Sequence, residues 1–201
     1  GKTTLRFCLK IEGKKSNGLV VIEDLKIKEG GLEAYAGMNV VMRRCTVEEC
    51  AYSGVSAYKA DVTCDDLQVI GCGGSGVLAE DTHTIKLINC EIKECNGSGI
   101  ESRGTGVIDI LGEKTNIHHN NGGNSRNFYG VLAVDFSVIR IHAPLQENCI
   151  YENNFIEPPD EYPSSEDSAT ALGRNFLPDD QDDEDQYDWY GAVCLVDEAD
   201  N

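Results

Sequence analysis

Three stretches of the sequence repeat one pattern and decide the fold. They read CTVEECAYSGV at residues 45–55, LQVIGCGGSGV at 67–77 and CEIKECNGSGI at 90–100, with starts 22 and 23 residues apart. Repeats of this length are typical of solenoid proteins, in which each repeat packs only on its neighbours. The same register extends back to Leu25 and forward to Asn153, so six turns can be written before the C-terminal segment.

Each repeat contains three short segments in which apolar and other residues alternate. In the first of the clear repeats these segments are 40–42, 45–47 and 55–57. Alternation with period two predicts strands with one buried face, and no segment between them has the helical period. Equivalent strands of successive coils are then expected to pair in parallel about 4.8 Å apart, in a right-handed coil. Sharp turns at the strand starts are predicted at three glycines: Gly54, Gly76 and Gly99.

The last third of the chain departs from the regular repeat. After Asn153 the turn expands into residues 155–189, and Gly191 then restarts the third strand as Gly130 does one coil earlier. We therefore predict an all-β, right-handed parallel β-helix of about six to seven coils with three short strands each. Residues 1–154 and 190–201 would form it, the final strand would cap it, and 155–189 would be an acidic loop inserted in the last coil.

The net charge of −18 is unevenly distributed along the chain. Residues 155–201 hold 15 of the 35 acidic residues and a single basic residue, Arg174. A negative surface disfavours binding to nucleic-acid backbones, so no nucleic-acid partner is expected. No apolar run approaches the length of a transmembrane helix, so no such segment is expected either.

Nine cysteines raise the question of disulfides or metal ions. Their spacing differs from the closely spaced pairs of a zinc site, and we predict no metal. Disulfides between neighbouring coils stay open as an alternative, although mostly inward thiols favour a reducing compartment such as the cytoplasm or an organelle interior. Four cysteines are expected at inward strand positions, where a thiol behaves as a small hydrophobe: Cys45, Cys64, Cys90 and Cys194. A structural ladder is expected along one corner: Cys50, Cys72, Cys95, Asn120 and Asn153.

Residues 19–154 resemble the parallel β-helix repeats of the pectate-lyase-like superfamily, through the repeated Asn/Cys-x-x-x-Gly-Val/Ile pattern. That superfamily includes polysaccharide lyases, polygalacturonases, alginate epimerases and F-box proteins with a β-helix, so the resemblance implies the fold and not the chemistry. Of the polygalacturonase motifs, only Asp65-Asp66 is present. The alginate-epimerase motif Tyr-Gly-Phe-Asp-Pro-His is missing as well.

The first functional hypothesis is a non-enzymatic interaction or scaffold module, a subunit or segment of a larger assembly that needs no cofactor. Ten of the 14 aromatic residues lie between Phe128 and Tyr190, together with a cluster of acids. Such a region is suited to bind a protein partner, although the aromatic residues alternatively pin the loop onto the coil. The predicted partner-binding residues are Asp179, Asp180, Asp182, Asp183, Glu184, Asp185, Tyr187, Asp188 and Trp189.

The second hypothesis is a carbohydrate-active enzyme, a lyase or epimerase that acts on an acidic polysaccharide with Ca²⁺ as a bridging ion. Glu80 and Arg103 are expected as outward neighbours on the third strand, with Glu101 beside Arg103 and Tyr58 at the start of the column. The alternative is that these residues form only a solvent-exposed salt bridge between neighbouring coils, without a catalytic role. His118 and His119 suggest a general base or a pair of metal ligands, unless one of the two side chains faces inward or lies in the turn.

Overall fold

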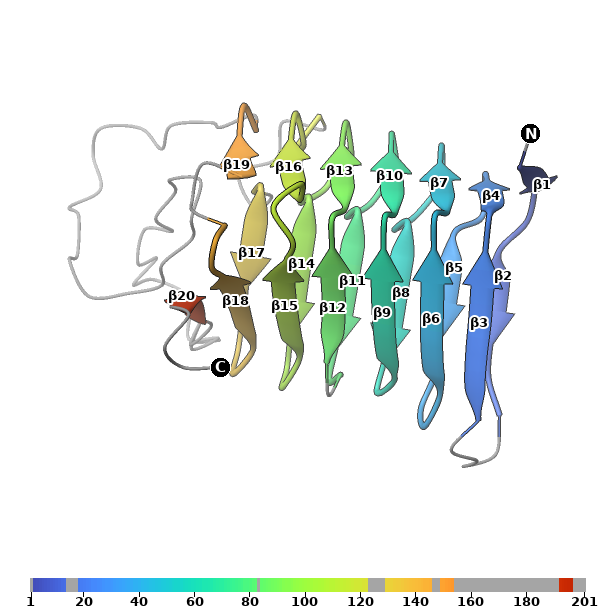
Figure 1. The fold of residues 1–201 in the computed structure, drawn as a ribbon, viewed down its shortest axis with the longest axis horizontal. Coiled ribbons are helices and arrows are strands. Elements are labelled where there is room, and N and C mark those ends of the chain that lie inside the picture. Colours follow the sequence, from blue (N-terminus) through green and yellow to red (C-terminus); the bar gives the residue numbers. More distant parts are fainter. Residues whose placement is uncertain are drawn as a thin grey trace, which may run out of the picture.

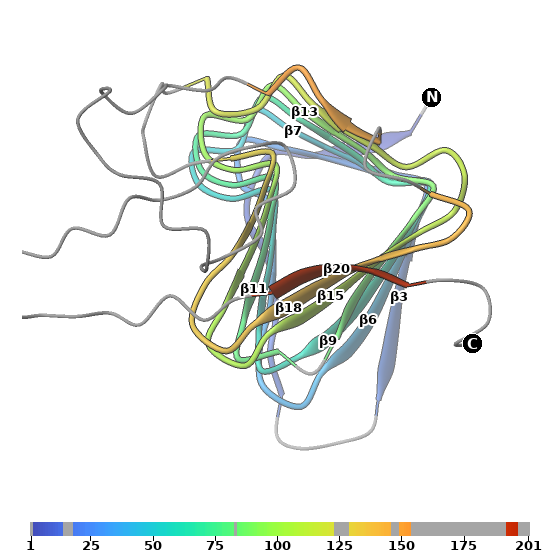
Figure 2. The same ribbon diagram turned by 90° about the vertical axis from the view of Figure 1, so that its left-hand side faces the viewer.

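The computed structural model of the protein describes residues 2–13, 18–82, 84–122, 129–145, 149–153 and 192–196. Within these ranges the regular elements are twenty β-strands, which form three parallel sheets. Seen along the solenoid axis, the three sheets enclose a core of triangular cross-section, and seen from the side the coils stack in a row (Figures 1 and 2). The predicted parallel β-helix is confirmed.

The three sheets are named A, B and C, and each takes one strand from every complete coil. Sheet A contains β1 (Thr3–Leu5), β4 (Leu25–Lys28), β7 (Thr46–Glu48), β10 (Gln68–Ile70), β13 (Glu91–Lys93), β16 (Asn116–His118) and β19 (Ile150–Tyr151). Sheet B contains β2 (Leu9–Ile11), β5 (Leu32–Ala34), β8 (Val55–Tyr58), β11 (Val77–Glu80), β14 (Ile100–Arg103) and β17 (Val131–Ala133). Sheet C contains β3 (Leu19–Glu23), β6 (Asn39–Arg43), β9 (Asp61–Asp65), β12 (Ile85–Ile88), β15 (Val107–Leu111), β18 (Val138–His142) and β20 (Ala192–Val196).

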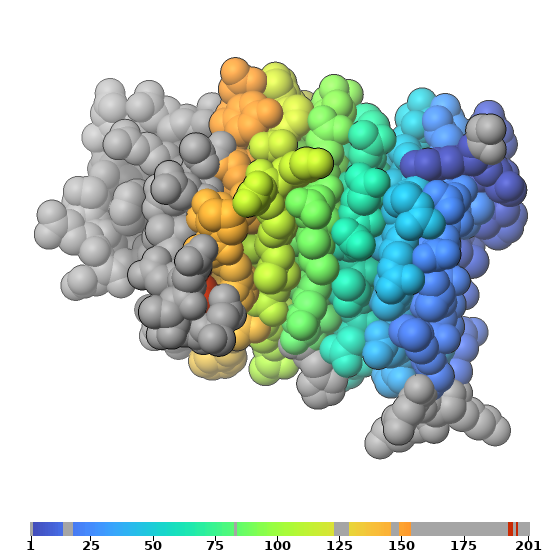
Figure 3. Space-filling view, in the orientation of Figure 1, coloured from blue at the N-terminus to red at the C-terminus, as the bar shows by residue number. Residues whose placement is uncertain are grey.

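Five coils in the described part of the chain are complete, and each runs through sheets C, A and B in that order. They extend from β3–β4–β5 to β15–β16–β17, with β1 and β2 before them and β18, β19 and β20 after them. The predicted number of six to seven coils is somewhat higher than the five complete coils of the described ranges, at whose two ends only parts of further coils are described. In the space-filling view each coil forms one band across the face (Figure 3).

The core is built from columns of similar side chains that stack from coil to coil. One column in sheet C runs through Val40, Val62, Ile85, Ile108 and Ile139, which pair in register and are almost completely buried. Each such aliphatic side chain contributes about 1.5–3 kcal/mol when it is removed from water. Because β-branched residues also favour the extended backbone, the same residues form the strands and fill the core.

The corners between sheets C and A turn on one residue in the left-handed region of backbone space. The φ angles there are 54° at Asp24, 51° at Arg44, 54° at Asp66, 53° at Asn89 and 78° at Gly112. This conformation is favoured by Asn, Asp and Gly, which occupy four of the five positions.

The repeated glycines 54, 76 and 99 do not adopt this left-handed conformation. A Cβ atom on Gly76 would lie 2.5 Å from Cγ2 of Ile92 and 2.6 Å from the carbonyl oxygen of Gly99. Glycine is thus required here by the close approach of the next coil. The prediction of a turn at the three glycines is wrong, since the left-handed residues between sheets A and B in these coils directly follow the strands of sheet A: Glu49, Gly71 and Glu94.

The last strand differs from its predicted position. β20 pairs in parallel with β18, so it extends sheet C, whereas the sequence analysis placed it in the third-strand column, which is sheet B. The register sets Val193, which is buried, beside Ile139 and places Cys194 beside Arg140. Cys194 is consequently exposed, and its predicted inward position is wrong. The predicted loop 155–189 lies outside the described residues.

Candidate functional site

The outer face of sheet B carries the side chains that the sequence suggested for carbohydrate chemistry. The structure pairs Tyr58 with Glu80 and Glu80 with Arg103, so these three residues lie in one column across β8, β11 and β14. Arg103 makes its ion pair within its own strand, since its Nε donates a hydrogen bond of 2.6 Å to Oε1 of Glu101.

Glu101 is an outward residue that is nevertheless only 3% exposed. Its neighbours in the outer column are Leu78 and Leu132, and its carboxylate also accepts a hydrogen bond from the hydroxyl of Ser75. A buried carboxylate needs such partners, because an uncompensated charge there is costly. Glu101 therefore binds Arg103 and Ser75 of its own chain.

Tyr35 belongs to the same column but was not recognised from the sequence. Its ring stacks on that of Tyr58, with centroids 5.2 Å apart and planes 18° apart. Its hydroxyl donates a hydrogen bond of 2.8 Å to Glu33, and this bond raises the pKa of Tyr35. The signal was present in the sequence, because Tyr35 and Tyr58 occupy the same position of successive repeats.

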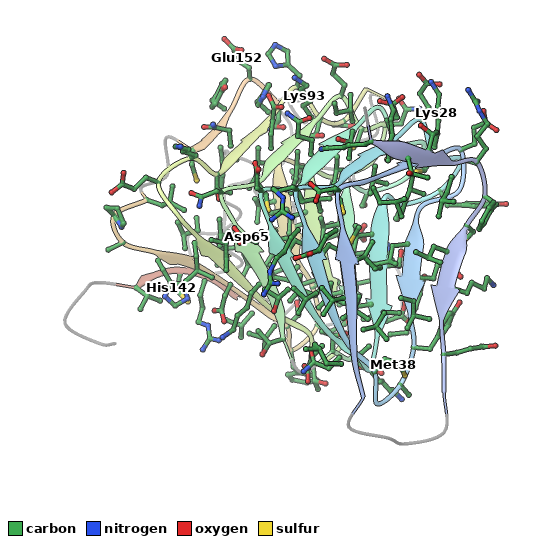
Figure 4. All side chains as sticks on the ribbon, turned by 45° about the vertical axis from the view of Figure 1, so that its right-hand side comes forward. Lys28, Met38, Asp65, Lys93, His142 and Glu152 are labelled. Atoms are coloured by element: carbon green, nitrogen blue, oxygen red, sulfur yellow. The ribbon has the colours of Figure 1, made fainter. Side chains whose placement is uncertain are left out.

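A second polar cluster lies on the outer face of sheet C and was also not recognised. The carboxylate of Asp109 accepts hydrogen bonds of 2.6 and 3.0 Å from Nε and Nη2 of Arg140, and Nε2 of His142 lies 2.8 Å from its Oδ1. Nδ1 of His142 is buried and has no hydrogen-bond partner among the residues that the structure describes. This cluster ties β15 to β18, and Figure 4 shows His142 well apart from Lys28 and Lys93.

The two adjacent histidines lie on the outer face of sheet A. His118 is the last residue of β16, and His119 follows in the left-handed region with a φ of 55°. The structure thus places one member of the pair on the strand and the other in the turn. Their Nδ1 atoms are 2.6 Å apart.

The corner ladder contains stacked thiols and amides. Asn120 accepts a hydrogen bond from the backbone N–H of Cys95 (3.1 Å) and donates one to the carbonyl of Ile92 (3.2 Å). Asn153 repeats the pattern one coil on, where its side chain donates to the carbonyl of Ile117 (3.1 Å). The ladder cysteines Cys50, Cys72 and Cys95 are buried.

All nine cysteines are free thiols. Cys45, Cys64 and Cys90 occupy inward positions in the core and are fully buried. Burial raises the pKa of Cys64, and it raises that of Cys90 to about 12. Both thiols therefore stay protonated near neutral pH and pack as small apolar side chains.

In the part of the chain that the structure describes, no three or more His, Cys, Asp or Glu side chains form a group that could hold a metal ion. The described residues also contain no helix of the length and apolar character that crossing a membrane requires. The nine predicted partner-binding residues, from Asp179 to Trp189, all lie outside the described residues.

Comparison with known proteins identifies the fold family. A family model described as "Right handed beta helix region" matches residues 8–150, which is well over half of the chain. A search of curated proteins and a search of solved structures found no match. The family match confirms the right-handed parallel β-helix and is consistent with the resemblance to the pectate-lyase-like superfamily. The chain belongs to the right-handed β-helix family.

Proposed function

We propose that the protein is a non-enzymatic interaction module, a β-helix scaffold within a larger assembly that binds a protein partner through its acidic and aromatic C-terminal region. The observation that carries this proposal is the contrast between two parts of the chain. The solenoid pairs many of its outer acids with its own bases, whereas residues 155–201 have a surplus of 14 acids over bases in their sequence.

Many acids on the outer faces of the solenoid are paired with bases of the same or neighbouring coils. Glu48 is 2.7 Å from Lys26 and 3.1 Å from Lys28, which precede it by one coil in sheet A. Glu91 is 3.0 Å from Lys93. Although burial acts to raise it, the hydrogen bond and the charge of Lys93 lower the pKa of Glu91, so this carboxylate is ionised at neutral pH. Some of these pairs join neighbouring coils, as at Glu48, and others lie within one strand, as at Glu91; together they balance part of the outer charge.

The C-terminal region has no such balance in its sequence. Residues 155–201 contain 15 acidic residues and a single basic residue. Tyr187 and Trp189 follow the densest acidic run in the sequence. Complementary charge accelerates and orients protein association, and aromatic anchors supply much of the binding energy. The expected partner is accordingly a protein with a basic surface that also offers pockets for aromatic side chains.

Neutralising the densest acidic run is expected to weaken partner capture about tenfold, since each lost rim charge removes a few tenths of a kcal/mol. The variant replaces four neighbouring residues: Asp182→Asn, Asp183→Asn, Glu184→Gln and Asp185→Asn. The measurement is quantitative pull-down from native extract at two salt concentrations. Stoichiometric capture by the wild type should also decrease as the salt concentration rises.

The control for this experiment changes the net charge by the same amount at exposed residues of the solenoid. It combines Glu12→Gln, Asp66→Asn, Glu94→Gln and Glu113→Gln, all at exposed positions. Capture by the control should equal that of the wild type. Equal capture by all three proteins, or an equal decrease in both variants, would contradict the proposal.

The alternative function is a lyase or epimerase of an acidic polysaccharide. It draws support from the column of Tyr58, Glu80 and Arg103, because an arginine can bind a uronate carboxylate and an acid can move a proton. Under this hypothesis Ca²⁺ would bridge the polymer to carboxylates. Depolymerisation or epimerisation of a uronate polymer with Ca²⁺, lost in Arg103→Met, would establish the enzyme and replace the interaction module.

A further inference from the structure

Three thiols form one part of the corner ladder between sheets A and B. Cys50, Cys72 and Cys95 each lie two residues after the end of a strand, after β7, β10 and β13, which pair in register and lie side by side in Figure 1. Beyond the strands, the N–H of Gly73 donates to the carbonyl of Cys50 (2.7 Å), and the N–H of Asn96 donates to that of Cys72 (2.8 Å). The Cα atoms of neighbouring thiols are therefore held near the strand spacing of about 4.8 Å, which lies within the range of about 4.4–6.8 Å that a disulfide spans.

The three sulfur atoms of this row point the same way. Each lies near the carbonyl oxygen two residues before it, at 3.7 Å for Cys50, 3.9 Å for Cys72 and 3.5 Å for Cys95. The second and third sulfur atoms also lie against the preceding coil. A Cβ atom on Gly54 would be 3.0 Å from Sγ of Cys72, and one on Gly76 would be 3.3 Å from Sγ of Cys95. The sulfur atoms consequently follow one another along the corner, with Cys72 between the other two.

The middle thiol of the row, Cys72, differs from the two that flank it. Hydrogen bonds from the thiols of Cys50 and Cys95, together with one from the backbone N–H of Cys50, lower the pKa of Cys72 although burial acts to raise it. The pKa of each flanking thiol is raised instead, first by its hydrogen bond with Cys72 and then by burial. Cys72 is therefore the thiol of the row that ionises most readily, and the thiolate is the nucleophilic form of cysteine.

The cysteines inside the core have no thiol at the same position of a neighbouring coil. Cys90 occupies a repeat position that is held by Leu67 in the preceding coil and by Thr115 in the following one. Burial raises its pKa, so this thiol stays protonated. The combination of an acidified thiol with a second thiol in register is thus a property of the corner row.

We propose that Cys72 and Cys50 form a reversible oxidation site, which a small peroxide converts into a disulfide between two neighbouring coils. Cys50 is 3% exposed, whereas Cys72 and Cys95 are 0% exposed, so the row meets solvent at Cys50. A small oxidant reaches Cys72 from that end. An access this narrow favours hydrogen peroxide over larger oxidants such as a glutathione disulfide, and Cys95, on the inner side, keeps its thiol.

The oxidation proceeds in two steps. The thiolate of Cys72 attacks one oxygen of the peroxide, the O–O bond breaks, and a sulfenic acid forms while the departing hydroxide takes up the proton that left Cys72. The sulfur of Cys50 then loses its proton and attacks the sulfenic sulfur, so that an S–S bond forms, the S–O bond breaks and water leaves. In sum, two thiols give up two electrons and two protons, and one peroxide becomes two water molecules. A small-molecule thiol reverses the modification by exchange.

The test treats the reduced whole protein with hydrogen peroxide, alkylates the remaining thiols after denaturation and maps disulfides by mass spectrometry of tryptic peptides. Cleavage after Arg44, Lys59 and Lys86 places Cys50 on peptide 45–59 and Cys72 on peptide 60–86. We expect these two peptides to be joined through Cys50 and Cys72, and dithiothreitol to separate them. Cys90 is the single cysteine of peptide 87–93 and should stay open to alkylation, as an internal control.

The matched variants are Cys72→Asn and Cys95→Asn. Asparagine occupies the same ladder position at residues 120 and 153, where its side chain accepts the backbone hydrogen bond of the preceding coil. Cys72→Asn should slow the joining of the two peptides at least about tenfold, whereas Cys95→Asn should retain it. Peptides that stay separate in the wild type would overturn the proposal. So would a link that persists in Cys72→Asn, or a wild-type link that joins peptide 60–86 to Cys95 instead of Cys50.

Discussion

Replacing Arg140 with methionine is expected to lower the free energy of unfolding by about 3 kcal/mol. The Asp109 side chain is only 8% exposed, and Arg140 supplies two of its hydrogen bonds, of 2.6 and 3.0 Å. Without the guanidinium, the buried carboxylate keeps only His142 as a partner in this cluster. The change removes little apolar packing, since methionine retains most of the aliphatic part of the side chain. Chemical denaturation at neutral pH measures the effect.

The chain offers a control with the same geometry in a different environment. Arg44 donates two hydrogen bonds of 2.9 Å to Asp24 one coil away, but the two side chains are 49% and 60% exposed. The hydrogen bonds from Arg44 lower the pKa of Asp24, yet solvent screens a pair this exposed. Arg44→Met should therefore hardly change the stability. Equal losses in the two variants would show that burial does not decide the strength of these pairs.

A second variant separates the loss of the pair from the burial of an unpaired charge. Combining Arg140→Met with Asp109→Leu removes the carboxylate as well as its partner. Replacing a whole buried pair with apolar side chains is often close to neutral, so most of the lost stability should return. If the double variant were as unstable as Arg140→Met alone, the loss in the free energy of unfolding would come from altered packing around β15 and β18. The unpaired carboxylate of Asp109 would then not be its cause.

The fold could be predicted because the same physical constraint acts on every coil. Inward positions such as Val62 and Ile85 stack on each other in register, so a spacing of 22 or 23 residues between similar apolar residues fixes both the strands and their pairing. The regular spacing alone could not show why glycine recurs at residues 54, 76 and 99. Their spacing is explained equally well by a turn or by a close approach, and only the distances from a hypothetical Cβ atom distinguish the two.

The candidate sites were harder to predict because they depend on which residues become neighbours after an irregular turn. Asp109 and Arg140 are 31 residues apart, since more residues separate β16 from β17 than separate the corresponding strands of earlier coils. No fixed offset would have paired them. β20 was misplaced for a related reason: alternation predicts a strand there, but the long preceding segment removes the offset that would assign it to sheet B or C.

Replacing Gly76 with alanine is expected to destabilise the protein by about 3 kcal/mol, the upper part of the range for overpacking. The added Cβ would lie 2.6 Å from the carbonyl oxygen of Gly99 and 2.5 Å from Cγ2 of Ile92. The first of these atoms belongs to the backbone of the next coil, whose N–H···O bonds with β11 fix its position. Relief of the contact therefore requires the two coils to separate, which weakens both hydrogen bonds and core contacts.

Gly71 provides the matched control for this prediction. It has a φ of 64°, and a Cβ atom placed on it would meet nothing within 4 Å. Asparagine adopts this backbone conformation readily, so Gly71→Asn should change the stability by less than about 1 kcal/mol. Both variants are compared by chemical denaturation. A loss for Gly71→Asn as large as for Gly76→Ala would show that the coils need glycine for its backbone freedom. A loss confined to Gly76→Ala would show that glycine is needed there because the next coil leaves no room for a side chain.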